Sequence, residues 1–201
     1  MKNFDFIIAG GGCAGLSLAY YLSQSKFADA SVLIIDREDK VKNDRTWCFW
    51  TDKPTAYESI VAKKWENLAF ADFKGKLQSK LRQRHYELIR GADFYHFTQD
   101  AIQKHSGYQW LRGEISEIGE DEQGAYAKVG GEYYRANWIF DSRYDWQSQQ
   151  ASAGNYHFLL QHFMGWIVET SQPAFDPESL TLMDFRVEQQ NSARFIYVLP
   201  F

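Results

Sequence analysis

The most constraining feature of the sequence is a cluster of four glycines, GGGCAG at residues 10–15, which fits the pattern G-x-G-x-x-G. Apolar residues 4–9 (FDFIIA) precede it and favour a buried strand. The residues after it repeat apolar side chains at the helical period, and residues 31–36 (SVLIID) favour a second buried strand. This strand–loop–helix–strand order is typical of a dinucleotide-binding βαβ unit.

The spacing of the glycines predicts a separate role for each one. Gly10 permits a tight turn after the strand, because glycine tolerates backbone angles that other residues avoid. Gly12 has no side chain, so its backbone can approach a pyrophosphate, and Gly15 lets the helix pack closely on the strand.

The start of the helix and the end of the second strand predict the remaining cofactor contacts. The helix begins with Cys13 and Ala14, whose N–H groups and positive dipole end favour phosphates. Asp36 is placed to accept hydrogen bonds from ribose hydroxyls, with Arg37 beside it. A glycine turn in a sheet without a ligand is the alternative, and the pattern by itself does not separate FAD from NAD.

Composition excludes several classes of protein. The 22 Lys and Arg residues against 26 Asp and Glu give a net charge of −4, which argues against binding to nucleic acid phosphates. A hydrophobic content of 45% indicates a globular chain. Aromatic residues make up 17% of the chain, which fits either an aromatic core or a pocket for a flat apolar ligand.

Cysteine and histidine usage indicates a reduced, metal-free protein. Cys13 and Cys48 are the only cysteines, and the five histidines show no metal-ligand spacing, so we expect no metal site. No window approaches the roughly 18 apolar residues of a membrane-spanning helix. The sequence therefore predicts a cytoplasmic protein, and no polybasic patch or amphipathic anchor stands out in it.

Hydrophobic patterns give a coarse series of elements. After the first βαβ unit we expect an irregular segment at 37–64, a mainly helical segment at 77–89 and a polar boundary at 145–155. Strands are predicted at 95–99, 108–117, 125–129, 133–140, 157–169, 179–187 and 194–201.

Five sequence blocks resemble one enzyme family. The segment DRTWCFW at residues 44–50 is similar to the signature of the lycopene cyclases. Further blocks in family order are QHFMGW at 161–166, FDP at 175–177, TLMDFR at 181–186 and FIYVLPF at 195–201. The resemblance covers essentially the whole chain and points to the bacterial β-cyclase type.

The resemblance implies an α/β fold with a Rossmann-like FAD-binding domain of the aromatic-hydroxylase (GR2) type and an antiparallel β substrate domain, truncated at its C-terminus. We expect residues 1–150 to be the FAD-binding domain, with a substrate-domain insertion around 45–100. Residues 151–201 would then begin the antiparallel substrate-binding sheet.

The resemblance also implies an activity. Lycopene would be converted through γ-carotene to β-carotene, by a proton-initiated isomerisation without net redox change that uses reduced FAD and NAD(P)H as the electron source. The substrate is a carotenoid of the bilayer, so the protein would be peripherally membrane-associated. The chain end, in an apolar strand-like run, suggests a fragment that lacks the family's acidic catalytic motif and its last FAD-binding segment.

The resemblance marks additional residues as candidates. Arg45 in the signature would approach the flavin or its phosphates, or would pair with a nearby Asp, and Ile115 and Ser142 would contact the cofactor. Trp47, Trp50 and Trp166 would line the substrate pocket, with core packing as the alternative for the first two. Candidates for a catalytic role are Glu169, predicted to follow a strand, and Asp184 and Arg186, predicted to share one strand face.

Two other functions remain open from the residues alone. An FAD-dependent monooxygenase, or a reductase of prenyl chains such as a geranylgeranyl reductase, shares the glycine loop and Asp36 but does not predict DRTWCFW. A non-catalytic carotenoid- or flavin-binding fragment is the third alternative. Product mass distinguishes the enzymes, because ring formation leaves it unchanged.

Overall fold

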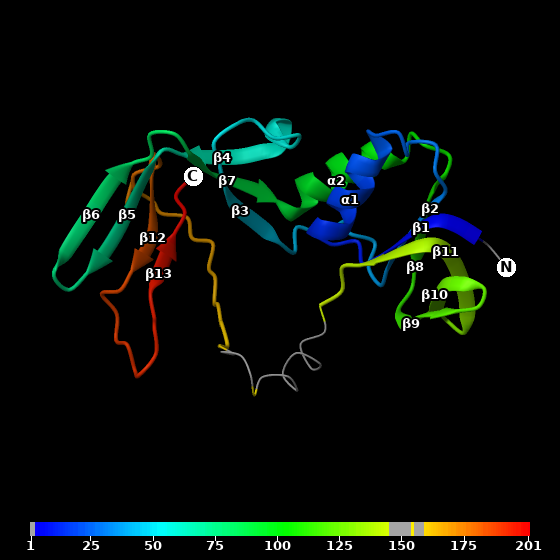
Figure 1. The fold of residues 1–201 in the computed structure, drawn as a ribbon. Coiled ribbons are helices and arrows are strands. Elements are labelled where there is room, and N and C mark those ends of the chain that lie inside the picture. Colours follow the sequence, from blue (N-terminus) through cyan, green and yellow to red (C-terminus); the bar gives the residue numbers. More distant parts are fainter. Residues whose placement is uncertain (1–2, 145–153, 155–158) are drawn as a thin grey trace. The chain divides into compact units, whose positions relative to one another are not determined.

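The computed structural model describes residues 3–144, 154 and 159–201 (Figure 1). The chain divides into two compact units, which are described separately. Unit 1 comprises Met1–Lys42 and Phe94–His162, and unit 2 comprises Asn43–Asp93 and Phe163–Phe201.

Unit 1 is built on a six-stranded sheet with strand order β8-β2-β1-β11-β10-β9. Its strands are β1 (Asn3–Ala9), β2 (Val32–Asp36), β8 (Tyr108–Arg112), β9 (Ile115–Asp121), β10 (Gly124–Val129) and β11 (Glu132–Asp141). The first four strands in this order are parallel, and β9–β10–β11 form an antiparallel meander. Helix α1 (Cys13–Ser23) connects β1 to β2, as the sequence predicts.

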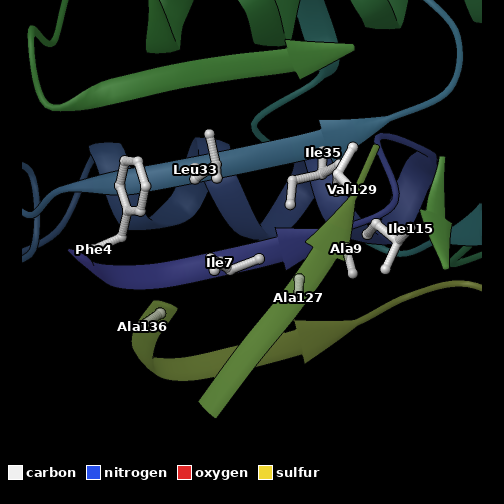
Figure 2. Close-up of a cluster of buried hydrophobic side chains, with 9 residues drawn as sticks. All are labelled: Phe4, Ile7, Ala9, Leu33, Ile35, Ile115, Ala127, Val129 and Ala136. Atoms are coloured by element: carbon white, nitrogen blue, oxygen red, sulfur yellow. The ribbon is translucent and has the colours of Figure 1, made fainter. Parts of the chain in front are cut away.

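The core of unit 1 explains why the central strands are almost continuously apolar. Buried side chains from β1, β2 and the meander meet on one side of the sheet (Figure 2). They are Phe4, Ile7, Ala9, Leu33, Ile35, Ile115, Ala127, Val129 and Ala136. Ile8 and Ile34 are also fully buried, together with Leu16 and Ala19 of α1. Strands covered on both faces need apolar side chains at successive positions.

Unit 2 contains two sheets. The first has the antiparallel order β3-β7-β4, from strands β3 (Thr46–Thr51), β7 (His85–Arg90) and β4 (Val61–Trp65), with a short 3₁₀ turn η1 (Glu58–Ile60) before β4. The second has the order β13-β12-β5-β6, from β13 (Ile196–Val198), β12 (Ser179–Asp184), β5 (Asn67–Asp72) and β6 (Gly75–Lys80). Its β5–β12 pair is parallel and its other pairs are antiparallel.

A single apolar cluster joins strands of both sheets in unit 2. Its buried members are Trp65, Leu68, Tyr86, Leu88 and Leu180. The indole Nε1 of Trp65 also donates to the carbonyl oxygen of Pro200 at 3.0 Å. The segment at the end of the chain is therefore tied into the core of unit 2.

Two predicted elements have the wrong type. Residues 77–89 are not helical: they contain the end of β6, a connection and most of β7. Leu77, Leu81 and Leu88 have helical spacing, but Leu88 is buried between partners on β3 and β4, whereas Leu77 is exposed. Residues 95–99 are not a strand but part of helix α2 (Gly91–Ile102).

Helix α2 shows why a five-residue window misleads. Within 95–99, aromatic and polar residues alternate as they do in a strand. Over the whole element, the buried side chains are those of Phe94, Tyr95, Thr98 and Ile102, which is the spacing of one helix face.

The remaining differences concern the extent of elements. The segment 37–64 is not wholly irregular, because it includes β3, η1 and most of β4. Residues 108–117 form parts of two strands, β8 and β9, and the strands at 179–187 and 194–201 are shorter than predicted. Residues 159–169 form no strand, and 157–158 lie outside the described residues, as does most of the polar boundary at 145–155.

Candidate dinucleotide-phosphate site

The glycine loop begins with a turn that depends on Gly10. Its φ is +104°, in the left-handed region that favours glycine. A Cβ there would lie 2.6 Å from Oγ of Ser142, which follows β11. That hydroxyl donates to the carbonyl oxygens of Ala9 at 3.0 Å and Gly10 at 3.1 Å. Ser142 therefore holds the loop against the end of β11, within the site predicted from the sequence.

Gly15 and Gly12 differ sharply in their surroundings. A Cβ on Gly15 would lie 1.9 Å from the carbonyl oxygen of Gly10 and 3.1 Å from Cγ2 of Ile8, so only glycine allows this contact between α1 and β1. A Cβ on Gly12 would meet nothing within 4 Å among the described residues. The loop is thus closed on its strand side and open at Gly12.

The first turn of α1 faces this open space without a side-chain cap. Gly12 is the N-cap residue and provides no capping hydrogen bond, and Cys13 and Ala14 are exposed. The first N–H groups of a helix have no partner within it, and the dipole makes this end positive. An open glycine backbone beside an uncapped eleven-residue helix fits the pyrophosphate of a dinucleotide.

Asp36 lies beside the loop and organises its backbone. Oδ2 accepts from the N–H of Gly11 at 2.7 Å, and Oδ1 accepts from the N–H of Glu38 at 2.8 Å. The ammonium of Lys40 is 3.4 Å from Oδ1, and the Asp36 side chain is only 11% exposed. A carboxylate has about four acceptor positions, so Asp36 can fix the loop and still accept a ribose hydroxyl. Arg37, by contrast, extends into solvent.

Trp110 of β8 was not predicted from the sequence as a member of the site. Its indole edge would be 2.5 Å from a Cβ on Gly11, so the ring lies directly against the glycine loop. Trp110 is the register partner of Ile34, two residues before Asp36, on the parallel strand β2. The sequence offers one signal for Trp110: it is an aromatic residue in a strand. Its place beside the glycine loop becomes known only once β8 is paired with β2.

Arg143 is the second residue that sequence reasoning missed. Its guanidinium donates to both carboxylate oxygens of Asp141 at 2.9 Å, and this hydrogen bonding lowers the pKa of Asp141. Another nitrogen donates to the carbonyl oxygen of Ile115 at 3.0 Å. The predicted cofactor contact Ile115 therefore has its carbonyl oxygen engaged by Arg143, and it is the register partner of Val129 on β10.

The remaining candidates belong to unit 2. The Arg45 side chain is largely exposed and lies 3.6 Å from Asp44, the ion pair that the sequence offered as an alternative. Trp47 is half-buried on β3, and the Trp50 ring lies 4.6 Å from that of Tyr86. Trp166 is exposed.

Glu169 differs from its prediction. It does not follow a strand, because residues 159–169 have no regular structure. Its side chain is exposed there, so no strand of the described chain directs it toward a substrate.

Asp184 and Arg186 form an ion pair at the end of β12. Nε of Arg186 donates to one carboxylate oxygen at 2.9 Å and Nη2 donates to the other at 2.7 Å. These hydrogen bonds lower the pKa of Asp184 to about 2. Asp184 is therefore an anion at neutral pH, and it cannot act there as a proton donor.

A thiol and two phenols form a network in unit 2 that the sequence did not indicate. The hydroxyl of Tyr197 donates to that of Tyr86 at 3.0 Å, and Cys48 hydrogen-bonds to both tyrosines. Burial raises the pKa of the Cys48 thiol and of both phenols. All three groups therefore stay protonated near neutral pH.

Unit 2 also buries one carboxylate. The side chain of Glu87 on β7 is 1% exposed, and its Oε1 lies 3.0 Å from Nζ of Lys64 on β4. Lys64 also bonds Glu58, and this hydrogen bond is the main cause of its raised pKa. Within the described residues, Oε2 of Glu87 has no hydrogen-bond partner.

The described residues offer neither a metal site nor a membrane-spanning helix. Residues 3–144, 154 and 159–201 contain no group of three or more side chains arranged to hold a metal ion. No helix in the same ranges is long and apolar enough to cross a membrane.

Solved structures identify the fold class. The p-nitrophenol 4-monooxygenase PnpA from Pseudomonas putida DLL-E4 matches with a TM-score of 0.54 and 16% identity, over 70% of this chain and 41% of that one. The halogenase PltM in complex with phloroglucinol and FAD matches with a TM-score of 0.52 and 16% identity, over 75% of this chain and 36% of that one. The fold is that of the FAD-dependent monooxygenases and halogenases, which confirms the predicted Rossmann-like class.

Sequence comparison identifies the family within that class. Residues 5–201 match the family described as Lycopene cyclase protein, and the chain belongs to this family. A lycopene beta-cyclase from Pseudescherichia vulneris is 27% identical over 206 residues, which cover 98% of this chain and 48% of that protein. One from Pantoea ananas is 26% identical over 213 residues, covering 98% and 49%. The chain therefore spans about half the length of these curated relatives.

Proposed function

We propose that this chain is the cofactor-binding and substrate-contacting part of an FAD-dependent lycopene β-cyclase. The observation that carries the proposal is the loop at residues 10–15, closed behind Gly15 and open at Gly12, in a chain that matches the lycopene cyclase family over residues 5–201. The family comparison supports a carotenoid substrate, and the fold supports FAD.

Unit 1 is the proposed FAD domain. The N–H groups at Gly12, Cys13 and Ala14 would hold the pyrophosphate, and Asp36 would accept from the ribose. Ser142 and the backbone of Ile115 would complete the cofactor contacts, and the exposed Arg37 would meet the charged outer part of the dinucleotide. FAD, reduced by NAD(P)H, would supply the reduced flavin that the family resemblance implies.

Unit 2, including the insertion at 43–93, is the proposed substrate-facing domain. Cyclisation adds a proton to an alkene, passes through a carbocation and ends with loss of a proton. Trp47 and Trp50 supply aromatic faces of the kind that stabilise cations, and Trp166 would extend this pocket. Asp184, held ionised by Arg186, supports a cation by its charge rather than by donating a proton.

The first experiment tests the cofactor. The purified chain of 201 residues is incubated with FAD and passed through a gel-filtration column while its visible absorbance is recorded. The expected result is a flavin band that elutes with the protein. A flavin band that elutes only with free FAD would contradict cofactor binding by this chain.

The second experiment tests the reaction. The protein expressed from its full reading frame is incubated anaerobically with lycopene, FAD and NADPH, and the products are analysed by mass spectrometry. The expected product has the mass of lycopene and the spectrum of a ring-bearing carotene. A gain of two hydrogens would instead show a prenyl-chain reductase, and a gain of one oxygen in an aerobic sample would show a monooxygenase.

A further inference from the structure

The connection from β5 through β6 to β7 carries an unusual concentration of positive charge. Residues 73–84 (FKGKLQSKLRQR) contain five Lys and Arg residues and no acidic residue. The other 17 cationic and 26 acidic residues give the remainder of the chain a net charge of −9. Residues 73–84 are therefore a strongly basic segment in an otherwise acidic chain.

The fold places residues 73–80 of this basic segment on an exposed hairpin and residues 81–84 in the connection to β7. All residues of β6 are exposed, and β6 forms an edge of its four-stranded sheet (Figure 1). Asp72 closes the turn by accepting from the N–H groups of Lys74 and Gly75 at 2.8 and 3.0 Å. Of the five cations, only Lys80 lies within 4 Å of a carboxylate among the described residues, that of Glu66 at 3.5 Å.

Two large apolar side chains stand among these cations. Phe73 in the turn is 77% exposed and Leu77 on β6 is 66% exposed. Cations around exposed apolar side chains match the boundary of an anionic bilayer, where ammonium groups meet lipid phosphates and apolar groups reach the acyl chains. Lysine stems can span this boundary while the charge remains in water.

Nucleic acid is a poorer match for the same surface. Phosphates would satisfy the lysines, but they offer no apolar environment to Leu77. A long polyanion would also meet the acidic remainder of the chain, whereas a membrane contacts one face only.

We propose that the β5–β6 hairpin docks on an anionic lipid membrane, with Phe73 and Leu77 at the acyl boundary and Lys74 and Lys76 at the lipid phosphates. The choice of a membrane rests in part on the proposed function, because a carotenoid substrate resides in the bilayer. A helix over 77–89, which the sequence predicts, would not place Lys74 and Lys76 in one strand hairpin. The hairpin instead presents Lys74, Lys76 and Lys80 together with both apolar side chains on one exposed element.

Vesicle co-sedimentation of the purified chain tests the proposal. We expect binding to mixed phosphatidylcholine–phosphatidylglycerol vesicles, little binding to phosphatidylcholine alone, and release at about 1 M salt, where charge interactions are screened. The double variant Lys74→Glu/Lys76→Glu should bind at least about 25-fold more weakly, given the contribution of each basic residue near a charged surface. Phe73→Ser/Leu77→Ser should weaken binding about tenfold through lost apolar contact.

Lys42→Glu/Lys104→Glu is the matched control. It changes the net charge equally, at two exposed positions of unit 1, and should retain most of the vesicle binding. An equal loss of vesicle binding in Lys74→Glu/Lys76→Glu and in the control Lys42→Glu/Lys104→Glu would overturn the proposal. Binding of the wild type to single-stranded RNA but not to vesicles would overturn it too. Circular dichroism checks that each variant is folded.

The design separates this proposal from the proposed function. The vesicles contain no carotenoid, and cyclisation is assayed separately on the protein expressed from its full reading frame, with lycopene in detergent micelles, where docking is not required. Hairpin-dependent vesicle binding without ring formation would refute only the cyclase. Ring formation without hairpin-dependent binding would refute only the docking surface.

Discussion

Gly12 and Gly15 lie three positions apart in the same loop, and one methyl group should affect them in opposite ways. Gly15→Ala would force a Cβ against the carbonyl oxygen of Gly10, 1.9 Å away, so we expect a loss of about 3 kcal/mol in the free energy of unfolding. Gly12 has φ −80° and open space around it, so Gly12→Ala should leave stability nearly unchanged. Urea denaturation of both variants measures this difference.

The same pair of variants separates folding from binding. In the proposed cofactor site, the Gly12→Ala methyl group would occupy space needed by the pyrophosphate. We therefore expect that variant to fold normally and to lose at least about tenfold in FAD affinity, a cost of about 1.4 kcal/mol. A Gly12→Ala protein with wild-type FAD affinity would argue against phosphate binding at this position.

Much of the loop could be predicted from residues 4–36, because the roles of glycines depend on local backbone geometry. Gly10 has the positive φ that a tight turn requires, and Gly15 makes the close helix–strand contact. Trp110 and Arg143 could not be predicted in the same way. They reach the loop only through strand pairing between segments far apart in the sequence, which no local pattern records.

At the scale of elements, the Lys64–Glu87 pair links neighbouring strands β4 and β7. Lys64→Met would leave the fully buried carboxylate of Glu87 without its cation, and we expect a loss of about 3 kcal/mol in the free energy of unfolding. Lys64→Met/Glu87→Leu removes both charges and should recover most of that loss. Thermal and urea denaturation of the wild type and the two variants measure the effect. A stable Lys64→Met variant would show that water already solvates Glu87.

Element type was predicted well where burial was uniform and poorly where it was mixed. The strands β1 and β2 are buried on both faces, so their apolar runs are unambiguous. In β6 and β7 an exposed strand precedes a buried one, and their combined apolar positions imitate a helix. In α2, residues 95–99, which favour a strand by themselves, are one part of a longer helix.

At the scale of the whole molecule, the two units should respond differently to the cofactor. If FAD binds the loop at residues 10–15, it stabilises unit 1 by an amount that grows with the logarithm of the FAD concentration above Kd, about 2.7 kcal/mol at 100 times Kd. Hydrogen exchange followed by mass spectrometry should then show slower exchange in β1, β2 and the first turn of α1. Strands β5 and β12 of unit 2 should change much less. Equal protection throughout the chain would contradict a site confined to unit 1.

The parallel pairing of β5 with β12 has a consequence for synthesis on the ribosome. Asn67 and Ser179 are register partners, although more than a hundred residues separate them. The six-stranded sheet can be completed once β11 has emerged, but β5 must wait until β12 is translated. During that interval β5 would expose a strand edge and the apolar side chains Leu68 and Phe70. A nascent chain paused between β11 and β12 is therefore a natural client for a chaperone that binds apolar strands.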